Sequence, residues 1–123
     1  VLGAEAVSFW AGVPKPGVDR DIAAAWLRKG VARVLEHAER RGVAAALEPE
    51  TGMLVETLDD WIGLSRDLPA LTLALDLGHC LVTGEREPPA AVHEFKAILG
   101  TVAIEDMRRG VHEHLPFGEG DMD

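Results

Sequence analysis

The chain has 123 residues, the size of a single domain, and 47% of them are hydrophobic. This share is enough to build a packed core and argues against intrinsic disorder. The formal net charge of −9 disfavours a nucleic-acid partner, because phosphate groups bind to basic surfaces.

The sequence also lacks the usual marks of export and membrane insertion. Cys80 is the only cysteine, so no intrachain disulfide can form, as is typical of a reducing cytoplasm. No basic segment followed by an apolar core opens the sequence, so no signal peptide is expected. No apolar run reaches the length of a membrane span. We therefore expect a soluble cytoplasmic protein without a membrane partner.

A strand followed by a long helix is expected first. Residues 5–10 end on β-favouring Phe9 and Trp10 and predict a strand, and residues 11–17, with two prolines, predict a loop. A helix then begins after Asp19 or Asp21 and runs to about Arg41, where Gly42 provides a stop. Apolar residues at helical spacing predict its buried face: Ile22, Ala25, Trp26, Val31, Val34, Leu35 and Ala38.

Two buried strands flank the second predicted helix. Residues 43–47 are wholly apolar and run into Glu48, as expected for a buried strand. Thr57 and Asp60 resemble a capping box, and the helix that they open is expected to reach about Asp67. Residues 71–76 then predict a strand that ends on Asp76.

The last third of the chain is predicted in less detail. Residues 80–87 are expected to form a loop, and Pro88 and Pro89 to begin a helix that Gly100 ends. Residues 101–105 predict a fourth strand, and residues 106–123 show no clear periodicity. The expected buried face of this helix comprises Val92, Phe95, Ile98 and Leu99.

Wholly apolar strands that alternate with amphipathic helices indicate an α/β fold with a parallel sheet and right-handed crossovers. Four such strands are compatible with a small open sheet or with part of a closed barrel. We expect residues 1–123 to form one domain, because no linker or repeat divides them.

Polar side chains follow each of the later predicted strands. They are Glu48, Asp76 with His79, the pair Glu105 and Asp106, and the His112-Glu113-His114 run. Because the carboxyl ends of parallel strands lie at one edge of a sheet, these groups should converge. Carboxylate and imidazole ligands suit Mn, Mg, Co or Zn.

Each group alone also has a simpler structural explanation. A glutamate after a strand is commonly solvated, Asp76 could cap a turn, and the two histidines at 112 and 114 could be an exposed loop pair. His37 and His93 lie within predicted helices and are taken as structural. The expected convergence favours a functional site.

Three sequence motifs resemble those of a known family. They are Ala46-Leu47-Glu48-Pro49, Leu75-Asp76-Leu77-Gly78-His79 and His114-Leu115-Pro116-Phe117-Gly118-Glu119-Gly120. In this order and spacing they resemble the xylose isomerase-like TIM barrels, which include sugar phosphate isomerases and epimerases and the related apurinic endonucleases. The resemblance implies a partial (β/α)8 barrel with about strands three to six.

The resemblance also implies roles for particular residues. Glu48 matches a metal ligand that in epimerases moves the substrate proton, and Asp76 matches a second metal ligand. His79 matches a residue that contacts substrate or a further metal. His112 and His114 match positions that bind an additional metal in some members, and Arg108 or Arg109 falls where a basic residue often meets a substrate hydroxyl or phosphate.

The implied chemistry is proton transfer next to a carbonyl of a sugar or sugar phosphate, assisted by a divalent Mn, Mg, Co or Zn ion. Two departures from the family pattern weaken this expectation of activity. Ala103 stands where the family usually has a histidine, and a whole barrel needs about 250 residues. We therefore expect weak activity or none from this chain alone.

The sequence is also compatible with two other functions and with association between chains. A binding or scaffold protein that has lost catalysis would tolerate Ala103, and a zinc-dependent apurinic endonuclease is disfavoured by the charge of −9. The first and last strands would leave free edges, so we expect self-association or pairing with a missing half-barrel.

Overall fold

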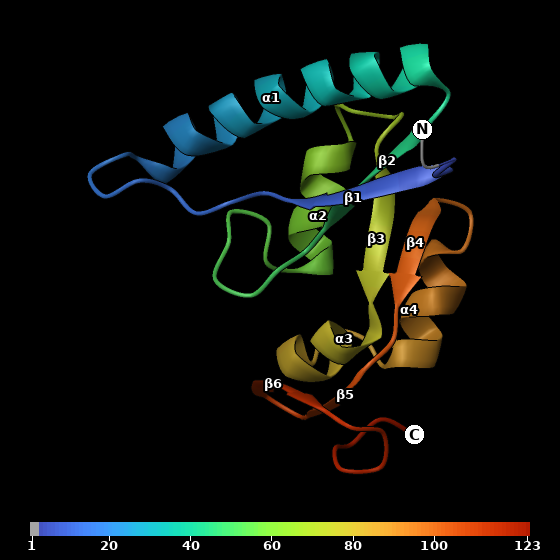
Figure 1. Cartoon of the computed structure of the whole chain (residues 1–123). Coiled ribbons are helices and arrows are strands. Elements are labelled where there is room, and N and C mark those ends of the chain that lie inside the picture. The colour runs from blue at the N-terminus through green and yellow to red at the C-terminus, as the bar shows by residue number, and fades with distance from the viewer. Residues whose placement is uncertain (1–2) are drawn as a thin grey trace.

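The computed structural model describes residues 3–123 and contains one parallel sheet of four strands (Figure 1). Consecutive strands are neighbours in the order β1-β2-β3-β4, and helices connect them. This is the arrangement of half of an eight-stranded barrel, so the predicted fold class is confirmed. The strands are β1 (Ala6–Trp10), β2 (Ala44–Glu48), β3 (Thr72–Asp76) and β4 (Leu99–Ala103).

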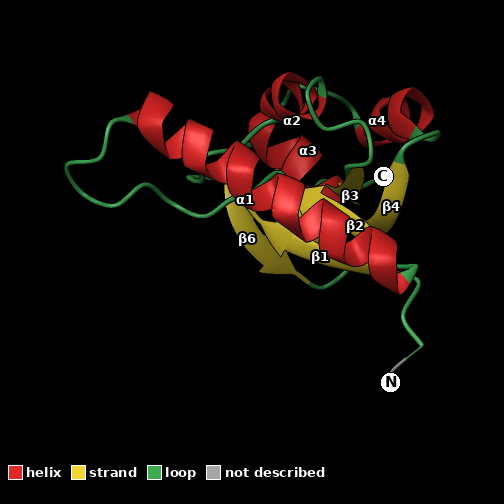
Figure 2. Ribbon diagram, turned by 90° about the horizontal axis from the view of Figure 1, so that it is seen from above, coloured by secondary structure: helices red, strands yellow, loops and turns green. Residues whose placement is uncertain are grey.

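Four helices pack against this sheet. In Figure 2 the long helix α1 lies across β1 and β2. Helix α2 connects β2 to β3, and α3 and α4 together connect β3 to β4. The bounds of the helices are α1 (Arg20–Arg41), α2 (Leu58–Ser65), α3 (Leu77–Thr83) and α4 (Pro88–Phe95).

The core lies between the sheet and the helices. Leu47, Leu73 and Leu75 are at most 1% exposed and pack with Trp61 and Phe95. These two aromatic rings meet edge to face, with centroids 6.3 Å apart. Alternation along each strand sends every second side chain to this core. The large residues of β2 and β3 therefore anchor the sheet from one side.

The opposite side of the sheet is built from small residues. A side chain at Gly100 of β4 would place its Cβ 2.4 Å from Thr72 Oγ1 and 2.8 Å from the Cβ of Ala46. Glycine in a strand marks a place where another backbone approaches closely. The prediction that Gly100 ends a helix is thus wrong, because Gly100 lies inside β4 and lets it fold over β2 and β3.

Gly100→Ala is expected to destabilise the fold by about 1–3 kcal/mol, because the added methyl group overpacks the contact with Thr72 and Ala46. Gly30→Ala is the matched control. Gly30 lies inside α1 with no atom within 4 Å of an added Cβ, so alanine should stabilise the helix by up to about 1 kcal/mol. Urea unfolding measures both changes. Equal effects of the two substitutions would contradict the close approach of β4.

Helix α1 has the predicted ends, and part of its predicted face, including Val31 and Ala38, is buried. Asp19 caps it by accepting from the backbone N–H of Asp21, and Gly42 ends it with a φ of 64°. However, Ile22 and Trp26 are 50% and 59% exposed. This helix lies over the first two strands, at the edge of the sheet, so part of its apolar stripe stays exposed. Its buried residues are Ala23, Val31 and Ala38.

The segment between β3 and β4 differs from the prediction in three ways. Residues 77–83 form α3, although residues 80–87 were expected to be a loop. Helix α4 ends at Phe95, so Ile98 is 39% exposed. Strand β4 begins at Leu99, two residues before the predicted start. Asp76 caps α3 by a side-chain hydrogen bond, which a helical hydrophobic pattern alone does not reveal.

A hairpin follows the sheet where no regular structure was predicted. Strands β5 (Asp106–Arg108) and β6 (Val111–Leu115) pair antiparallel, and Gly110 turns between them with a φ of 74°. Charged and histidine side chains hide the alternation that normally identifies strands. The hairpin lies near α3, at the lower end of the molecule in Figure 1.

The last residues wrap around a buried carboxylate. Asp106 is fully buried and accepts hydrogen bonds from the backbone N–H groups of Gly118, Gly120 and Met122 at 2.8, 3.0 and 2.9 Å. A Cβ at Gly120 would lie 2.2 Å from Asp106 Oδ1. The second glycine of the Phe-Gly-Glu-Gly motif is therefore required, because a side chain there would clash with this carboxylate.

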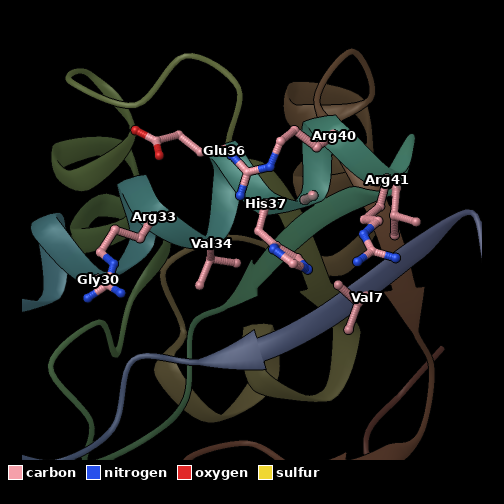
Figure 3. A pocket seen from close by; sticks show the side chains of 10 residues that line it. Val7, Gly30, Arg33, Val34, Glu36, His37, Arg40 and Arg41 are labelled. Atoms are coloured by element: carbon pink, nitrogen blue, oxygen red, sulfur yellow. The ribbon is translucent and has the colours of Figure 1, made fainter.

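A groove of about 640 Å³ lies between α1 and β1 (Figure 3). Val7 and Val34 form part of its apolar floor, and Arg33, Arg40 and Arg41 surround it. It is remote from the carboxyl ends of the strands, where the predicted site residues lie. Within residues 3–123, no helix combines the length and apolarity needed to cross a bilayer.

Candidate metal and proton-transfer site

Two carboxylates stand side by side at the carboxyl ends of the central strands. Glu48 is the last residue of β2, and Asp76 is the last residue of β3. Ala103 is paired with Asp76 across β3 and β4. Glu48, Asp76 and Ala103 line a cavity of about 240 Å³, together with Ser8, Ala74, Leu75, Thr101 and Val102. At ~30 Å³ per water, this cavity suits a small polar ligand.

The Asp-Leu-Gly-His word is explained by the start of α3. Asp76 Oδ1 accepts hydrogen bonds from the N–H groups of Gly78 at 2.7 Å and His79 at 3.2 Å, so it caps the helix. A Cβ at Gly78 would lie 3.0 Å from the side chain of Met107. Because Gly78 has no side chain, Met107 of the hairpin can pack against it. The first turn of the helix places His79 at the end of the sheet.

The side chain of His79 is 8% exposed and has one fixed hydrogen bond. Its Nδ1 lies 3.0 Å from the carbonyl oxygen of Pro49. A carbonyl can only accept, so Nδ1 carries a proton, and the lone pair of a neutral ring is on Nε2. That Nε2 lies 3.8 Å from Glu50 Oε2, which is too far for a hydrogen bond.

Glu50 is the site residue that sequence reasoning missed. Its side chain is 13% exposed, and Oε1 is buried without a hydrogen-bond partner in the described chain. The same oxygen lies 3.8 Å from His112 Nδ1. A signal was present, since residues two apart in an extended segment point the same way and Pro49 keeps Glu48 extended.

These side chains form two possible ligand groups that share His79. Glu48, Asp76 and His79 make one group, and Glu50, His79 and His112 make the other, with donor atoms within 4.8 Å of one another. The rings of His79 and His112 are nearly perpendicular, with centroids 5.1 Å apart. Of the side chains expected to converge, Glu48, Asp76, His79 and His112 lie together, whereas the Asp106 carboxylate accepts hydrogen bonds from the tail instead.

The surroundings of the site change the pKa of Glu48. Burial raises the pKa of the Glu48 carboxyl above its ordinary value, and the negative charges of Asp76 and Glu50 add to this. His79 and a hydrogen bond from Trp10 act in the opposite direction. Glu48 is thus a stronger base than a solvated glutamate.

The other predicted residues lie outside both groups. His114 is hydrogen-bonded to Glu105, and this bond raises the pKa of its ring. Arg108 pairs with Glu113 at 3.5 Å. Arg109 donates two hydrogen bonds, at 2.9 and 2.8 Å, to the Glu87 carboxylate. The structure therefore pairs both arginines with surface carboxylates.

Comparison with known proteins agrees with this geometry. The model of the xylose isomerase-like TIM barrel family matches residues 1–123. The chain belongs to this family. No curated protein matches it. In the family barrel, the four described parallel strands make up about half of the sheet.

The chain spans about half the length of the solved structures that share this barrel. A D-tagatose 3-epimerase-like protein is 22% identical, with a TM-score of 0.79 over 97% of this chain and 48% of that protein. The 3-keto-D-glucoside 4-epimerase from E. coli is 21% identical, with a TM-score of 0.70 over 96% and 47%. The IOLI protein with a binding zinc atom is 18% identical, with a TM-score of 0.78 over 99% and 47%. These likenesses show the fold.

The residues at the end of the barrel strands fit a divalent cation. Glu50 Oε1 is buried without a hydrogen-bond partner in the described chain, and its other oxygen, Oε2, lies 3.8 Å from His79 Nε2. Carboxylate and imidazole together suit zinc and related ions. Cys80 belongs to neither ligand group; its buried thiol donates to the Asp76 carbonyl oxygen at 3.7 Å, and burial raises the pKa of this thiol to about 11.

Proposed function

We propose that this chain carries out metal-dependent proton transfer next to the carbonyl of a sugar or sugar phosphate, as the isomerase or epimerase part of a barrel. The observation that carries the proposal is Glu48, a partly buried carboxylate of raised pKa that faces a small cavity beside cation ligands. Two of the structural neighbours are described as an epimerase and an epimerase-like protein, which supports this choice.

Each side chain of the site has a part in the proposed reaction. A divalent Mn, Mg, Co or Zn ion, when bound, would polarise the substrate carbonyl. Glu48 removes the proton from the neighbouring carbon, and its raised pKa makes it a better base for that step. Asp76 holds α3, and with it His79, in position through its cap.

The described chain supplies Glu48 as its most available base. Asp76 Oδ1 is occupied by two backbone donors, so Asp76 is less suited to return a proton on the other face. Proton removal and return by one carboxylate exchanges the carbon-bound hydrogen with solvent. Net epimerisation also needs a second acid on the opposite face of that carbon. We therefore expect exchange without robust turnover.

Deuterium incorporation tests this proposal directly. The chain is incubated in D₂O with a panel of ketoses and ketose phosphates and with each of Mn, Mg, Co and Zn. Proton NMR should show metal-dependent loss of the signal from the carbon next to the carbonyl of at least one substrate. EDTA should stop the loss. Absence of exchange with every substrate and metal would contradict the proposal.

A non-catalytic binding protein is the second candidate, and Ala103 is the observation that favours it. Its methyl group lines the cavity opposite Asp76 and offers no ligand or proton. A binding protein would hold a sugar in a calorimetric titration without exchanging its protons. Binding without exchange in the D₂O experiment would favour this function over catalysis.

We also propose that the chain self-associates through its free strand edges. Val7 of β1 and Val102 of β4 are 49% and 50% exposed. Arg33, Arg40 and Arg41 surround the groove beside β1, whereas the chain as a whole carries −9. The exposed apolar side chains at both edges therefore favour pairing of β4 of one copy with β1 of another.

Light scattering should show dimers or larger species of the chain at micromolar concentration. Val102→Lys combined with Ile104→Lys places charges on the β4 edge and should shift the chain towards the monomer. Phe117→Lys is the control, since Phe117 is 67% exposed but lies in the tail. A stable monomer of the unmodified chain would contradict this association.

A further inference from the structure

We propose that two copies of this chain close one eight-stranded barrel, in which Glu48 of each copy lies across the barrel from Glu48 of the other. The Glu48 of the second copy supplies the acid that a single copy lacks. The reaction rests on the proposed function, whereas the position of the two carboxylates follows from the sheet alone. The expectation of exchange without robust turnover applies to a single copy.

The sheet has half the strands of a barrel, and both of its outer strands have a free edge. Within residues 3–123, β1 pairs only with β2 and β4 pairs only with β3, and all three pairings in this sheet are parallel. A two-fold axis along the strands keeps this direction and places β4 of each copy beside β1 of the other. The eight parallel strands then form a closed ring without free edges.

The curvature of the sheet favours this closed ring over a flat pairing of two copies. A Cβ at Gly100 of β4 would lie 2.8 Å from the Cβ of Ala46 on β2. Side chains two strands apart on a flat sheet are separated by about 10 Å. The sheet is therefore already curved towards its inner face, as the wall of a barrel is. The exposed Val7 and Val102 of its two edges become buried when the ring closes.

The two-fold axis places Glu48 opposite itself. Strand β2 is the second strand of each copy, so the two β2 strands are four places apart in a ring of eight, which is half a turn. Strand spacing and tilt give such a ring a diameter of about 15 Å. Glu48 lines the inner cavity together with Ser8 and Ala103. The two carboxylates therefore approach a small molecule in the barrel from opposite sides.

Two opposed carboxylates complete the epimerisation of a ketose that one copy only begins. Glu48 of one copy takes the proton from the carbon next to the carbonyl, and the electron pair of the broken C–H bond passes into an enediolate. Protonated Glu48 of the second copy gives its proton to the opposite face of the same carbon, which forms the new C–H bond with inverted configuration. Proton exchange with water restores both carboxyl groups.

Spin labels test the placement of Glu48 without substrate. Nitroxides are attached to Glu48→Cys, or to Ala103→Cys as a second inner position, in a Cys80→Ala background. Electron–electron resonance should give label separations below about 25 Å within the dimer. Glu36→Cys on α1 is the outer control, and its labels should be at least about 35 Å apart, because the helices surround the strands. Circular dichroism verifies that each labelled variant is folded.

Light scattering provides the oligomeric state for the same samples. A closed ring stops at two copies, whereas an open array of strands continues to grow. A discrete dimer with short inner distances would support the composite barrel. A monomer, a series of larger species, or inner distances as long as those of the Glu36→Cys control would overturn it.

Hybrid dimers test the catalytic part. The unmodified chain and Glu48→Gln carry different affinity tags, and dimers that hold one copy of each are purified through both tags. The hybrid should keep roughly half of the deuterium exchange of the unmodified dimer, because one of two equivalent bases remains. Its net epimerisation should fall by at least about 100-fold. A hybrid with Glu36→Gln should keep both activities.

A hybrid that keeps half of the epimerisation would overturn the shared site, because one copy would then supply both the base and the acid. Absence of deuterium exchange in the unmodified dimer would instead contradict the proposed function. The spin-label distances use no substrate, so they decide the placement of Glu48 separately from that result.

Discussion

Glu48→Gln is expected to reduce metal-dependent deuterium exchange at the substrate carbon by at least about 100-fold. Glutamine has nearly the same shape as glutamate, so the cavity beside Asp76 and Ala103 keeps its form. The substitution removes the one group that burial and neighbouring charges have made more basic. The rate is measured by proton NMR in D₂O with saturating metal.

Glu36→Gln is the matched control, because Glu36 is an exposed glutamate of α1 beside the remote groove. It should exchange protons at the rate of the unmodified chain. Zinc affinity is measured in the same variant, because Glu48 belongs to one of the two possible ligand groups and loss of the base must be separated from loss of the ion. Exchange that persists in Glu48→Gln would assign the proton transfer to another residue.

Asp106→Asn is expected to give the largest loss of stability among conservative polar substitutions. Asp106 is fully buried and accepts three backbone hydrogen bonds that hold the tail. Asparagine replaces one acceptor oxygen by a donor, which then faces a backbone N–H group. The midpoint of thermal unfolding should fall by roughly 5 °C or more. Asp67→Asn, at a 74% exposed carboxylate paired with Arg28, should shift it by about 1–2 °C at most.

The effect of Asp106→Asn should also depend on pH. Hydrogen bonds from the amides of Met122, Gly120 and Gly118 hold the pKa of Asp106 below its ordinary value. A lowered folded pKa stabilises the fold above the unfolded pKa of about 3.9 and loses this contribution as pH falls further. The difference between the two proteins should therefore be constant near neutrality and shrink below about pH 4. A difference that does not depend on pH would show that charge is not involved.

The sheet and its large helices could be predicted because their signals are local. The apolar runs that end at Glu48 and Asp76 identify buried strands, and the caps at Asp19 and Thr57 identify helix starts. The missed parts have two causes. Helix α3 is short and begins at a local cap, Asp76, without an apolar stripe long enough to identify it, whereas Gly100 belongs to a strand because of a tertiary contact, the close approach of β4 to Ala46 and Thr72.

Some residues of the candidate site could be predicted from the sequence and others could not. Parallel strands necessarily bring Glu48 and Asp76 together, so that part followed from the order of elements. The position of His112 required the β5–β6 hairpin, which has no apolar alternation. The importance of Glu50 required the tautomer of His79, and this is set by the carbonyl of Pro49, a backbone atom that sequence patterns do not describe.

The residues of one possible ligand group come from segments that are far apart in the chain. Glu50 follows β2, His79 lies in the first turn of α3 and His112 lies on β6. An ion bound to all three would act as a cross-link in a protein whose single cysteine cannot form one within the chain. Like a disulfide, it would restrict the unfolded chain by closing two long loops. The cation would then be part of what holds the hairpin against the sheet, and removing it would loosen the tail of the domain as well as the site.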